Sequence, residues 1–472
     1  MAPALSKTLL SARVLALGAA TVAFAVVLFV PSVLNDGDTY WHIAAGRWML
    51  DNQAVLRIDP FSYTFAGHPW QTHEWLAECA MALAYVGAGW NGVVLLFGVA
   101  AALTAGLLAR HLSRWLGGLS LAVTLLLALA CVAGSLLARP HLLALPLLEI
   151  WTAALIIARD ERRAPSWKLL PLMLLWANLH ASFLIGLALI LPFALEAIVE
   201  ESTARGAALR HWGLFAAAAL AMALITPYGA DGLIFPFRLM AMPSLMQVGE
   251  WGPTDFRIFQ PLALAIAAAL YVLLSRGARI KPVRIVVLLA LLYLAVIHVR
   301  HHMLIAIVGA LILGEPLARA LDAVPQIDRP LRRVILGFAV IIAALAGLRL
   351  SLPFERMDGA TTPATALAHV PAALTKMAVF NDYAFGGYLI FNDVRPFIDS
   401  RAELYGDDFL SRYAALIHPD KAALETTLAK RHVRWTILAP DNPAVGALDT
   451  MSGWHRLYAD RWAVVHIRDG AP

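Results

Sequence analysis

Apolar runs of roughly 20 residues recur along the first 350 residues, and no other feature constrains the fold of this chain so strongly. A helix needs roughly 20 apolar residues to cross the ~30 Å hydrocarbon core of a bilayer, because every backbone donor and acceptor must be satisfied inside the membrane. We therefore predict an α-helical polytopic membrane protein of about eleven spans, the fifth of them short. The spans lie near residues 11–32, 91–110, 118–138, 141–158, 168–181, 183–199, 211–228, 258–275, 284–299, 302–320 and 331–351.

The composition divides the chain near residue 355. Hydrophobic residues make up 60% of the whole chain and charged residues 15%, which excludes a single soluble enzyme, a disordered chain and a coiled coil. The charged fraction rises from about 12% in residues 1–354 to about 22% in residues 355–472. We predict a membrane domain over 1–354 and a small soluble α/β domain over 355–472. Cys79 and Cys131 are the two cysteines, too few for a disulfide framework or a cysteine-based zinc site.

Positive charge predicts the orientation, since cytoplasmic loops carry an excess of Lys and Arg. With a cytoplasmic N-terminus, the inner segments hold about 18 Lys and Arg residues, from Lys7 to Arg333, and the outer loops about seven. An odd number of spans then places the C-terminal domain outside the cytoplasm. We expect the first span to be an uncleaved anchor, because no convincing small-residue cleavage site follows it.

The first outer loop, residues 33–90, is the longest polar stretch of the membrane domain. Asp36 and Asp38 stand just past the first span, and an amphipathic helix with Trp41 and Trp48 on its apolar face follows. The two carboxylates either cap a helix in a solvated loop or carry chemistry, as a general base or a pair of divalent-metal ligands, and their position right after the first span favours the second interpretation. Asp59-Pro60 and Gly67 indicate turns, before a helix that opens near His73.

Other polar residues gather at the outer ends of the predicted spans. Arginine there either extends to the interface or clamps a phosphate, and histidines suit an interface as well as a site. Glu149, within the fourth predicted span, is expected to face a cavity or a partner. Glu250-Trp251 lies in the loop before the eighth span. The candidate binding residues are His42, His73, Glu74, Arg139, His141, Asn178, His180, Arg300, His301 and His302.

The C-terminal segment has the pattern of a small α/β domain. We predict strands at Met377–Phe380, Gly387–Phe391, Pro396–Ile398, Trp435–Leu438 and Trp462–Ile467, and helices at 362–375, 407–417 and 419–431. Gly386-Gly387 indicates a turn. Four polar residues near one strand end are candidates for contact with a saccharide or with the membrane site: Asp399, Arg401, Glu403 and Tyr405.

Short motifs carry a resemblance to a known superfamily. They are D-G-D-T-Y-W-H-I-A-A-G (36–46), D-P-F-S-Y-T (59–64), H-E-W-L-A-E (73–78), N-D-Y-A-F-G-G-Y-L-I (381–390) and F-I-D-S-R (397–401). With the acidic motif, the span number and the outer C-terminal domain, they resemble the GT-C superfamily of integral membrane glycosyltransferases, in particular a bacterial group described only in general terms. A second acidic motif of that superfamily has no counterpart on a later loop.

The resemblance implies transfer of a sugar from a polyprenyl-phosphate donor to an envelope glycan, lipid or protein at the outer face of the bacterial cytoplasmic (inner) membrane. It places the catalytic acids at Asp36 and Asp38, with a divalent cation as an open possibility and no other cofactor or nucleic acid expected. Arg139 and Arg300, with His301 or His302, would then stabilise the departing phosphate.

Two alternatives of another class stay open. Many spans, Glu149 and the outer histidines also suit a transporter or lipid flippase, although no internal repeat is visible. The second alternative is a non-catalytic protein of envelope assembly.

Overall fold

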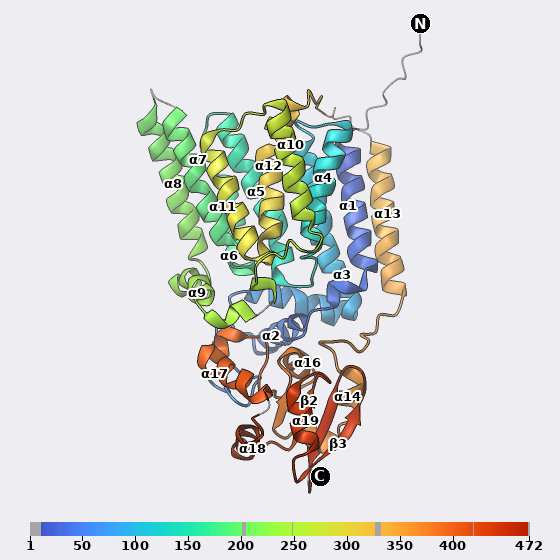
Figure 1. The fold of residues 1–472 in the computed structure, drawn as a ribbon. Helices are drawn as coiled ribbons and strands as arrows, with labels where there is room; N and C mark the ends of the chain where they lie inside the picture. The colour runs from blue at the N-terminus through green and yellow to red at the C-terminus, as the bar shows by residue number, and fades with distance from the viewer. Residues whose placement is uncertain (1–10, 201–203, 248, 326–331, 419, 471–472) are drawn as a thin grey trace.

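Each predicted span coincides with a helix in the structure, a computed structural model that describes residues 11–200, 204–247, 249–325, 332–418 and 420–470. Lys7 and Arg329, counted above among the inner charges, lie outside the described residues. The helices that occupy the predicted ranges are α1 (Ala12–Phe29), the second part of α3 (Trp75–Leu112), α4 (Gly118–Ala133), α5 (Pro140–Asp160), α6 (Leu170–Leu179), α7 (Phe183–Glu200), α8 (Arg205–Ala223), α10 (Pro261–Arg276), α11 (Pro282–Ile297), α12 (His302–Ala320) and α13 (Arg332–Ser351). They lie side by side in one bundle (Figure 1).

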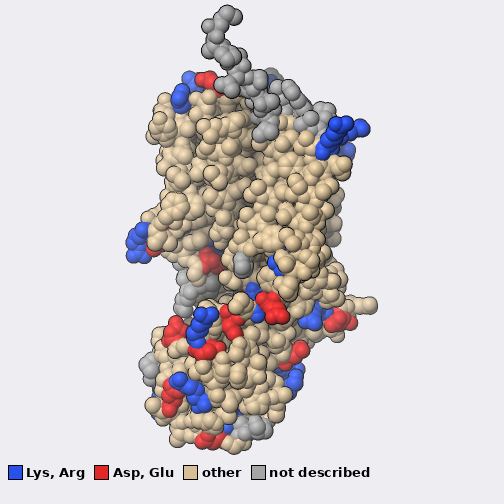
Figure 2. All heavy atoms as spheres, turned by 90° about the vertical axis from the view of Figure 1, so that its right-hand side faces the viewer, with Lys and Arg blue, Asp and Glu red and all other residues tan. Residues whose placement is uncertain are grey.

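Length and composition identify several of these helices as candidate membrane spans. Six among the described residues are both long and apolar enough to cross a bilayer, namely 12–29, 75–112, 140–160, 183–200, 299–320 and 332–351. Four more apolar helices are shorter, at 118–133, 167–179, 261–276 and 282–297. Figure 2 shows a broad band across the bundle without charged side chains on the face it presents. The chain is a multi-pass membrane protein, and the number of eleven crossings stays a prediction.

Two further helices lie across the end of the bundle that faces the C-terminal domain (Figure 1). They are α2 (Asp38–Asn52) and the first part of α3, which bends at Ala88 and Gly89. Gly89 adopts φ 57°, a left-handed conformation that glycine reaches without steric cost. The short α9 (Ala230–Met240) lies at the same end. The predicted interfacial helices of the first outer loop are therefore confirmed as helices.

Ion pairs join the opposite end of the bundle, where predicted cytoplasmic charges meet acidic residues. Arg284 binds Glu196 through Nε at 2.9 Å, and Lys281 Nζ lies 2.7 Å from the same carboxylate. Arg159 Nη2 lies 2.8 Å from Glu200. These pairs hold the ends of α5 and α7 to the start of α11.

The C-terminal domain contains a four-stranded sheet in the order β1-β2-β4-β3. Its strands are β1 (Val379–Asn381), β2 (Trp435–Leu438), β3 (Trp454–Ala459) and β4 (Val464–Arg468). The β1–β2 pair is parallel, and the β2–β4 and β3–β4 pairs are antiparallel. Its helices are α14 (Ala364–Ala368), α15 (Ala372–Thr375), α16 (Gly386–Phe391), α17 (Ala402–Ile417), α18 (Lys421–Lys430) and α19 (Pro443–Asp449).

The structure corrects several predicted elements of this domain. The segment predicted as a strand at Gly387–Phe391 is helix α16, because a short apolar run fits either element. Pro396–Ile398 is not part of the sheet, and the predicted helix over 362–375 divides into α14 and α15. Strand β3 and helix α19 were not predicted. The strand at Trp435–Leu438 is confirmed as β2.

The first outer loop packs into the C-terminal domain. Trp41, Met49 and Trp70 belong to the same buried apolar cluster as Phe397 and Phe409. Burial of such large side chains is worth roughly 1.5–3 kcal/mol each. The loop and the C-terminal domain therefore form one packed unit below the bundle.

Candidate active site

The acidic motif follows directly from the end of α1. Asp36 is buried, with 5% of its surface exposed, and its Oδ1 accepts a hydrogen bond of 2.7 Å from the backbone N–H of Asp38. This bond is the turn that an aspartate makes with the backbone two residues on, and it opens α2. Asp36 is not the capping residue itself, because the N-cap of α2 is Gly37 and has no side-chain cap hydrogen bond. The side chain of Asp36 also has a charged partner.

Arg139 lies between three carboxylates. It precedes α5, and its Nε donates to Asp36 Oδ2 while Nη2 lies 3.0 Å from Asp36 Oδ1 and 2.9 Å from Asp38 Oδ2. Its Nη1 donates to both oxygens of Glu250, at 2.9 and 3.0 Å. Burial alone would raise the pKa of Glu250, but Arg139 and Arg300 lower it below its usual value. Arg139 is therefore fully engaged as a holder of the acidic groups.

Arg300 is the less committed of the two cations. Its Nη1 lies 3.5 Å from Glu250 Oε1, which is its one ion pair within the described part of the chain. Its guanidinium stacks over the ring of Trp251 at 4.1 Å. A stacked guanidinium keeps its N–H donors in the plane of the group, free to bind an incoming anion.

Asp38 combines a cationic partner with partial exposure. Its side chain is 17% exposed, and its Oδ1 accepts a hydrogen bond from the hydroxyl of Ser400 in the C-terminal domain. Trp41 Nε1 donates to the same hydroxyl oxygen at 3.0 Å. Burial raises the pKa of Asp38 to about 7, against the opposing effect of Arg139. Near neutral pH this carboxyl group can therefore both accept and release a proton.

Three histidines surround Glu74 beside this cluster. Glu74 Oε1 lies 3.4 Å from His180 Nε2 and 3.6 Å from His73 Nε2, and Oε2 lies 3.8 Å from His42 Nε2. Burial raises the pKa of Glu74 to about 8 and lowers that of His73 to about 4. Burial also lowers the pKa of His42. The cluster is thus predominantly uncharged at neutral pH, and Glu78 holds His42 from the other side at 3.2 Å.

The remaining candidates have other partners. His141 Nε2 donates to the carbonyl of Ser135 at 2.8 Å, and its ring lies 6.2 Å from that of His180. His302 is buried and shares a 2.7 Å hydrogen bond with Thr254.

His301 Nδ1 lies 3.3 Å from the carbonyl of Leu294. Within the described residues, neither His301 nor His302 contacts the carboxylate pair.

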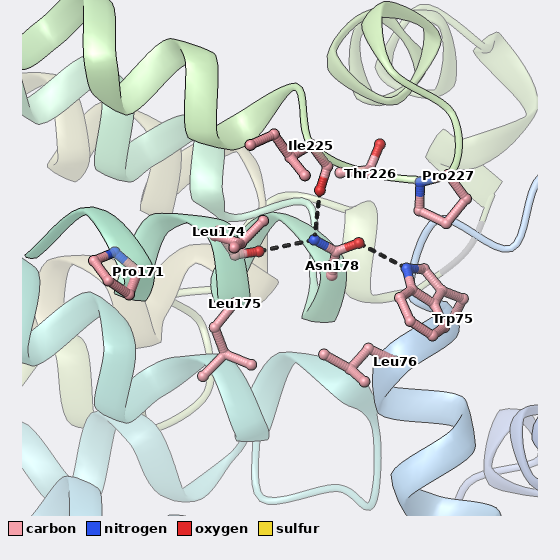
Figure 3. A pocket seen from close by; sticks show the side chains of 9 residues that line it. All are labelled: Trp75, Leu76, Pro171, Leu174, Leu175, Asn178, Ile225, Thr226 and Pro227. Carbon is pink, nitrogen blue, oxygen red and sulfur yellow. Dashed lines mark hydrogen bonds between the residues drawn. The ribbon is translucent and has the colours of Figure 1, made fainter.

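Asn178 forms the wall of an apolar cavity of about 470 Å³ at the end of the short α6 (Figure 3). Its amide donates to the carbonyls of Leu174 and Ile225, and its Oδ1 accepts from Trp75 Nε1 at 2.8 Å. The rest of the lining is largely apolar: Leu76, Pro171, Leu175, Thr226 and Pro227. Because Trp75 is the neighbour of Glu74 in the chain, the cavity lies next to the histidine cluster.

The polar residues of the F-I-D-S-R segment have a different role from the one considered above. Arg401 Nη1 lies 2.8 Å from Asp59, its Nη2 lies 2.6 Å from Asp399, and all three side chains are fully buried. Tyr405 donates to Asp399 at 2.6 Å, and Glu403 accepts from Trp70 at 2.9 Å. These groups fasten the first outer loop to the C-terminal domain; Asp399, Arg401 and Tyr405 are buried, and Glu403 is half-buried.

Three groups of the site were not among the predicted site residues. Glu250 and Ser400 stood in motifs noticed in the sequence, but only the fold brings them to Asp38 and Arg139. Glu78 lies one helical turn after Glu74, which is a spacing that places both on one face.

In this structure Asp36 and Asp38 both bind the guanidinium of Arg139. Within the described ranges no group of three or more His, Cys, Asp or Glu side chains is placed to hold a metal ion. Asp36 and Asp38, considered above as ligands of a divalent cation, are both occupied by Arg139. The residues present therefore do not form a fitted cation site.

Three solved structures have a fold similar to that of this chain. The chain matches the oligosaccharyltransferase of Archaeoglobus fulgidus in the apo form with TM-score 0.50 and 11% identity, over 89% of this chain and 69% of that one. It matches ArnT of Cupriavidus metallidurans bound to undecaprenyl phosphate with TM-score 0.50, and apo ArnT with 0.55, both at 14% identity over 96% of this chain and 97% of that one. No protein-family model and no curated protein sequence matches the chain. The chain has the fold of the GT-C membrane glycosyltransferases.

Proposed function

We propose that this chain is a membrane glycosyltransferase that moves a sugar from a polyprenyl-phosphate donor to an acceptor hydroxyl or amine. The observation that carries the proposal is the cluster in which Asp36, Asp38 and Glu250 meet Arg139 and Arg300 just outside the bundle. An acid–base group beside a cation that can take a phosphate is what such a transfer needs. The shared fold with ArnT, which was solved with undecaprenyl phosphate, supports the donor class.

Asp38 is the proposed general base. It takes the proton from the acceptor, whose oxygen or nitrogen forms the new bond to the anomeric carbon of the sugar. General bases work best with a pKa near the operating pH, and burial gives Asp38 a pKa of about 7. Asp36 is bound through both oxygens to Arg139 and acts in this scheme by positioning Arg139 and the start of α2.

Arg300 is the proposed phosphate ligand. As the bond between the anomeric carbon and the phosphate oxygen breaks, the electron pair stays on that oxygen, and a nearby guanidinium stabilises the charge. Arg139 is already engaged by three carboxylates, so the weaker 3.5 Å pair of Arg300 with Glu250 is the one that an incoming phosphate can replace.

The apolar cavity beside Asn178 is the proposed seat of the first isoprene units. Its apolar lining suits a hydrocarbon chain, and Trp75 in its wall (Figure 3) directly follows Glu74 in the chain. The uncharged histidine cluster would then orient the sugar through hydrogen bonds without repelling an anionic donor.

The proposed setting is the outer face of a bacterial cytoplasmic membrane, with the N-terminus cytoplasmic and an envelope glycan, lipid or protein as acceptor. The positive-inside bias of the sequence supports this orientation. Figure 1 also agrees with this orientation, since α1 begins at the end of the bundle opposite the C-terminal domain.

The test is sugar transfer by purified protein in nanodiscs, from radiolabelled undecaprenyl-phosphate hexose, pentose and aminopentose donors to an acceptor extract of the same envelope. We expect Asp38→Asn to lower the rate by about 10²–10⁴-fold, the usual contribution of a general base. Asp255→Asn, at an exposed carboxylate paired with Arg257, is the matched control and should transfer normally. Full transfer by Asp38→Asn would exclude the assigned base, and uptake of substrate into sealed vesicles without covalent product would indicate a transporter.

A further inference from the structure

A second cavity, of about 910 Å³, opens between α2, the first outer loop and the C-terminal domain. Its walls come from residues 44–51 of α2, residues 60–63 of the loop, and residues 375–378 and 390–395 of the C-terminal domain. The volume lies at the upper end of the range of roughly 300–1,000 Å³ for small-molecule sites. The cavity plays no part in the chemistry proposed above.

The charges of this cavity are available to a ligand. It is lined by three cationic side chains, Arg47, Lys376 and Arg395, and by two acidic ones, Asp51 and Asp393. All five are exposed, and within the described residues their side chains make no hydrogen bond or ion pair with the protein. The excess of one positive charge favours a ligand with negative charge.

Aromatic side chains lie between these charges. Trp48, Phe61 and Tyr63 are part of the lining, each half-buried. The guanidinium of Arg47 stacks on Phe391, with 5.7 Å from Cζ to the ring centroid, which holds it at the rim. A lining that alternates flat apolar faces with hydrogen-bonding charges suits a ligand with apolar faces and many hydroxyl groups, which is the chemistry of a sugar chain.

The walls are held together by hydrogen bonds between the loop and the C-terminal domain, so the site is preformed. Tyr63 donates its backbone N–H to the carbonyl of Pro396 at 3.3 Å and its hydroxyl to the carbonyl of Val379 at 3.0 Å. Asn381 Oδ1 of β1 accepts a hydrogen bond of 2.7 Å from the backbone N–H of Phe397, which ties the segment after α16 to the sheet.

We propose that this cavity binds a segment of an anionic oligosaccharide, the part of the acceptor that is remote from the reacting group. The inference rests on the proposed function and adds the acceptor class to it. Arg47 follows Asp38 by nine residues of helix α2, or about 14 Å along the axis. A sugar chain seated against Arg47, Lys376 and Arg395 is therefore too far from Asp38 for its bound part to react, and only its end could reach the carboxylate.

The test measures binding alone, so its outcome is independent of whether the chain transfers sugars. Full-length protein in detergent is titrated calorimetrically with hexagalacturonate, an anionic oligosaccharide, and with neutral maltohexaose. We expect hexagalacturonate to bind more tightly than maltohexaose. Lys376→Glu with Arg395→Glu should weaken its binding about tenfold or more, since two attractive charges become repulsive. Lys430→Glu, at an exposed cation on α18 outside the lining, should bind as the unchanged protein does.

Two outcomes would overturn the proposal. The first is equal or absent binding of hexagalacturonate by the unchanged protein and the double variant. The second is binding of phosphatidylglycerol that hexagalacturonate does not displace and that the double variant loses, which would identify the cavity as a site for lipid phosphate. Loss of transfer in Asp38→Asn with intact binding would leave this site in place, whereas normal transfer with no binding would remove only this site.

Discussion

Arg401 offers the sharpest test of how the C-terminal domain holds the first outer loop. Its guanidinium is fully buried between Asp59 of the loop, at 2.8 Å, and Asp399 of its own domain, at 2.6 Å. It also stacks on the ring of Trp70 at 4.5 Å. Arg401→Met keeps most of the side-chain volume but leaves two carboxylates buried without a cation.

The expected cost follows from this burial. Removing one partner of a buried pair costs about 3–5 kcal/mol, because the remaining charge stays desolvated. At 1.4 kcal/mol for each factor of ten, the loop should open roughly 10²–10³-fold more often. Arg456→Met is the matched control in the same domain, since its 2.6 Å pair with Asp449 is 44% exposed on the arginine side. Its loss should cost at most about 1 kcal/mol, or roughly fivefold.

Hydrogen exchange followed by mass spectrometry measures these openings directly. In Arg401→Met, peptides over 59–70 should exchange roughly 10²–10³-fold faster, while peptides of the bundle keep their rates. If the loop peptides of Arg401→Met exchange no faster than those of Arg456→Met, the buried network does not hold the loop, and the packing of Trp70 against the domain must do so.

Three further predictions concern the site. Transfer should fall about tenfold for each pH unit below about 7, because only the ionised form of Asp38 accepts a proton and burial has raised its pKa to about 7; a rate independent of pH between 5 and 7 would contradict this. Arg300→Ala should lower kcat/KM for the donor about 10–100-fold, as the loss of a charge-assisted contact requires, and a steady-state titration of donor checks it. Gly387→Ala should lower transfer about 10²-fold, since its Cβ would lie 2.3 Å from the carbonyl oxygen of Gly37 and must displace the acidic motif, whereas Gly446→Ala meets nothing within 4 Å and should transfer normally.

The bundle was predictable because a membrane span is a local signal. An apolar run of sufficient length must be helical in a bilayer, whatever it packs against, and every predicted range contains a helix. The C-terminal domain lacks that constraint. Residues 386–391 could form a strand or a helix on local grounds, and the helix occurs because Gly386 packs against the backbone of Ile398 while Gly387 packs against Gly37. Those contacts are invisible before the chain folds.

The site was predictable in part for a related reason. The sequence predicts that four residues lie at the same end of different spans, namely Asp36, Asp38, Arg139 and Arg300. It does not predict the contacts between them. The difference in pairing between Arg139 and Arg300 could not be predicted from the sequence. It depends on Glu250, which the fold places between them at 2.9 Å from Arg139 and 3.5 Å from Arg300.

The hydrogen bond between Ser400 and Asp38 requires the site and the C-terminal domain to lie on the same side of the membrane. Ser400 belongs to the C-terminal domain, and its contact with Asp38 is direct. Gly387 of the same domain touches the backbone of Gly37, between the two carboxylates. The acidic motif and residues 355–472 must therefore lie on the same face of the membrane, whichever face that is. The opposite end of the bundle carries a group of cationic residues, namely Arg159, Lys281 and Arg284. Because the positive-inside rule assigns that end to the cytoplasm, it favours an extracytoplasmic position for the site and for the C-terminal domain together.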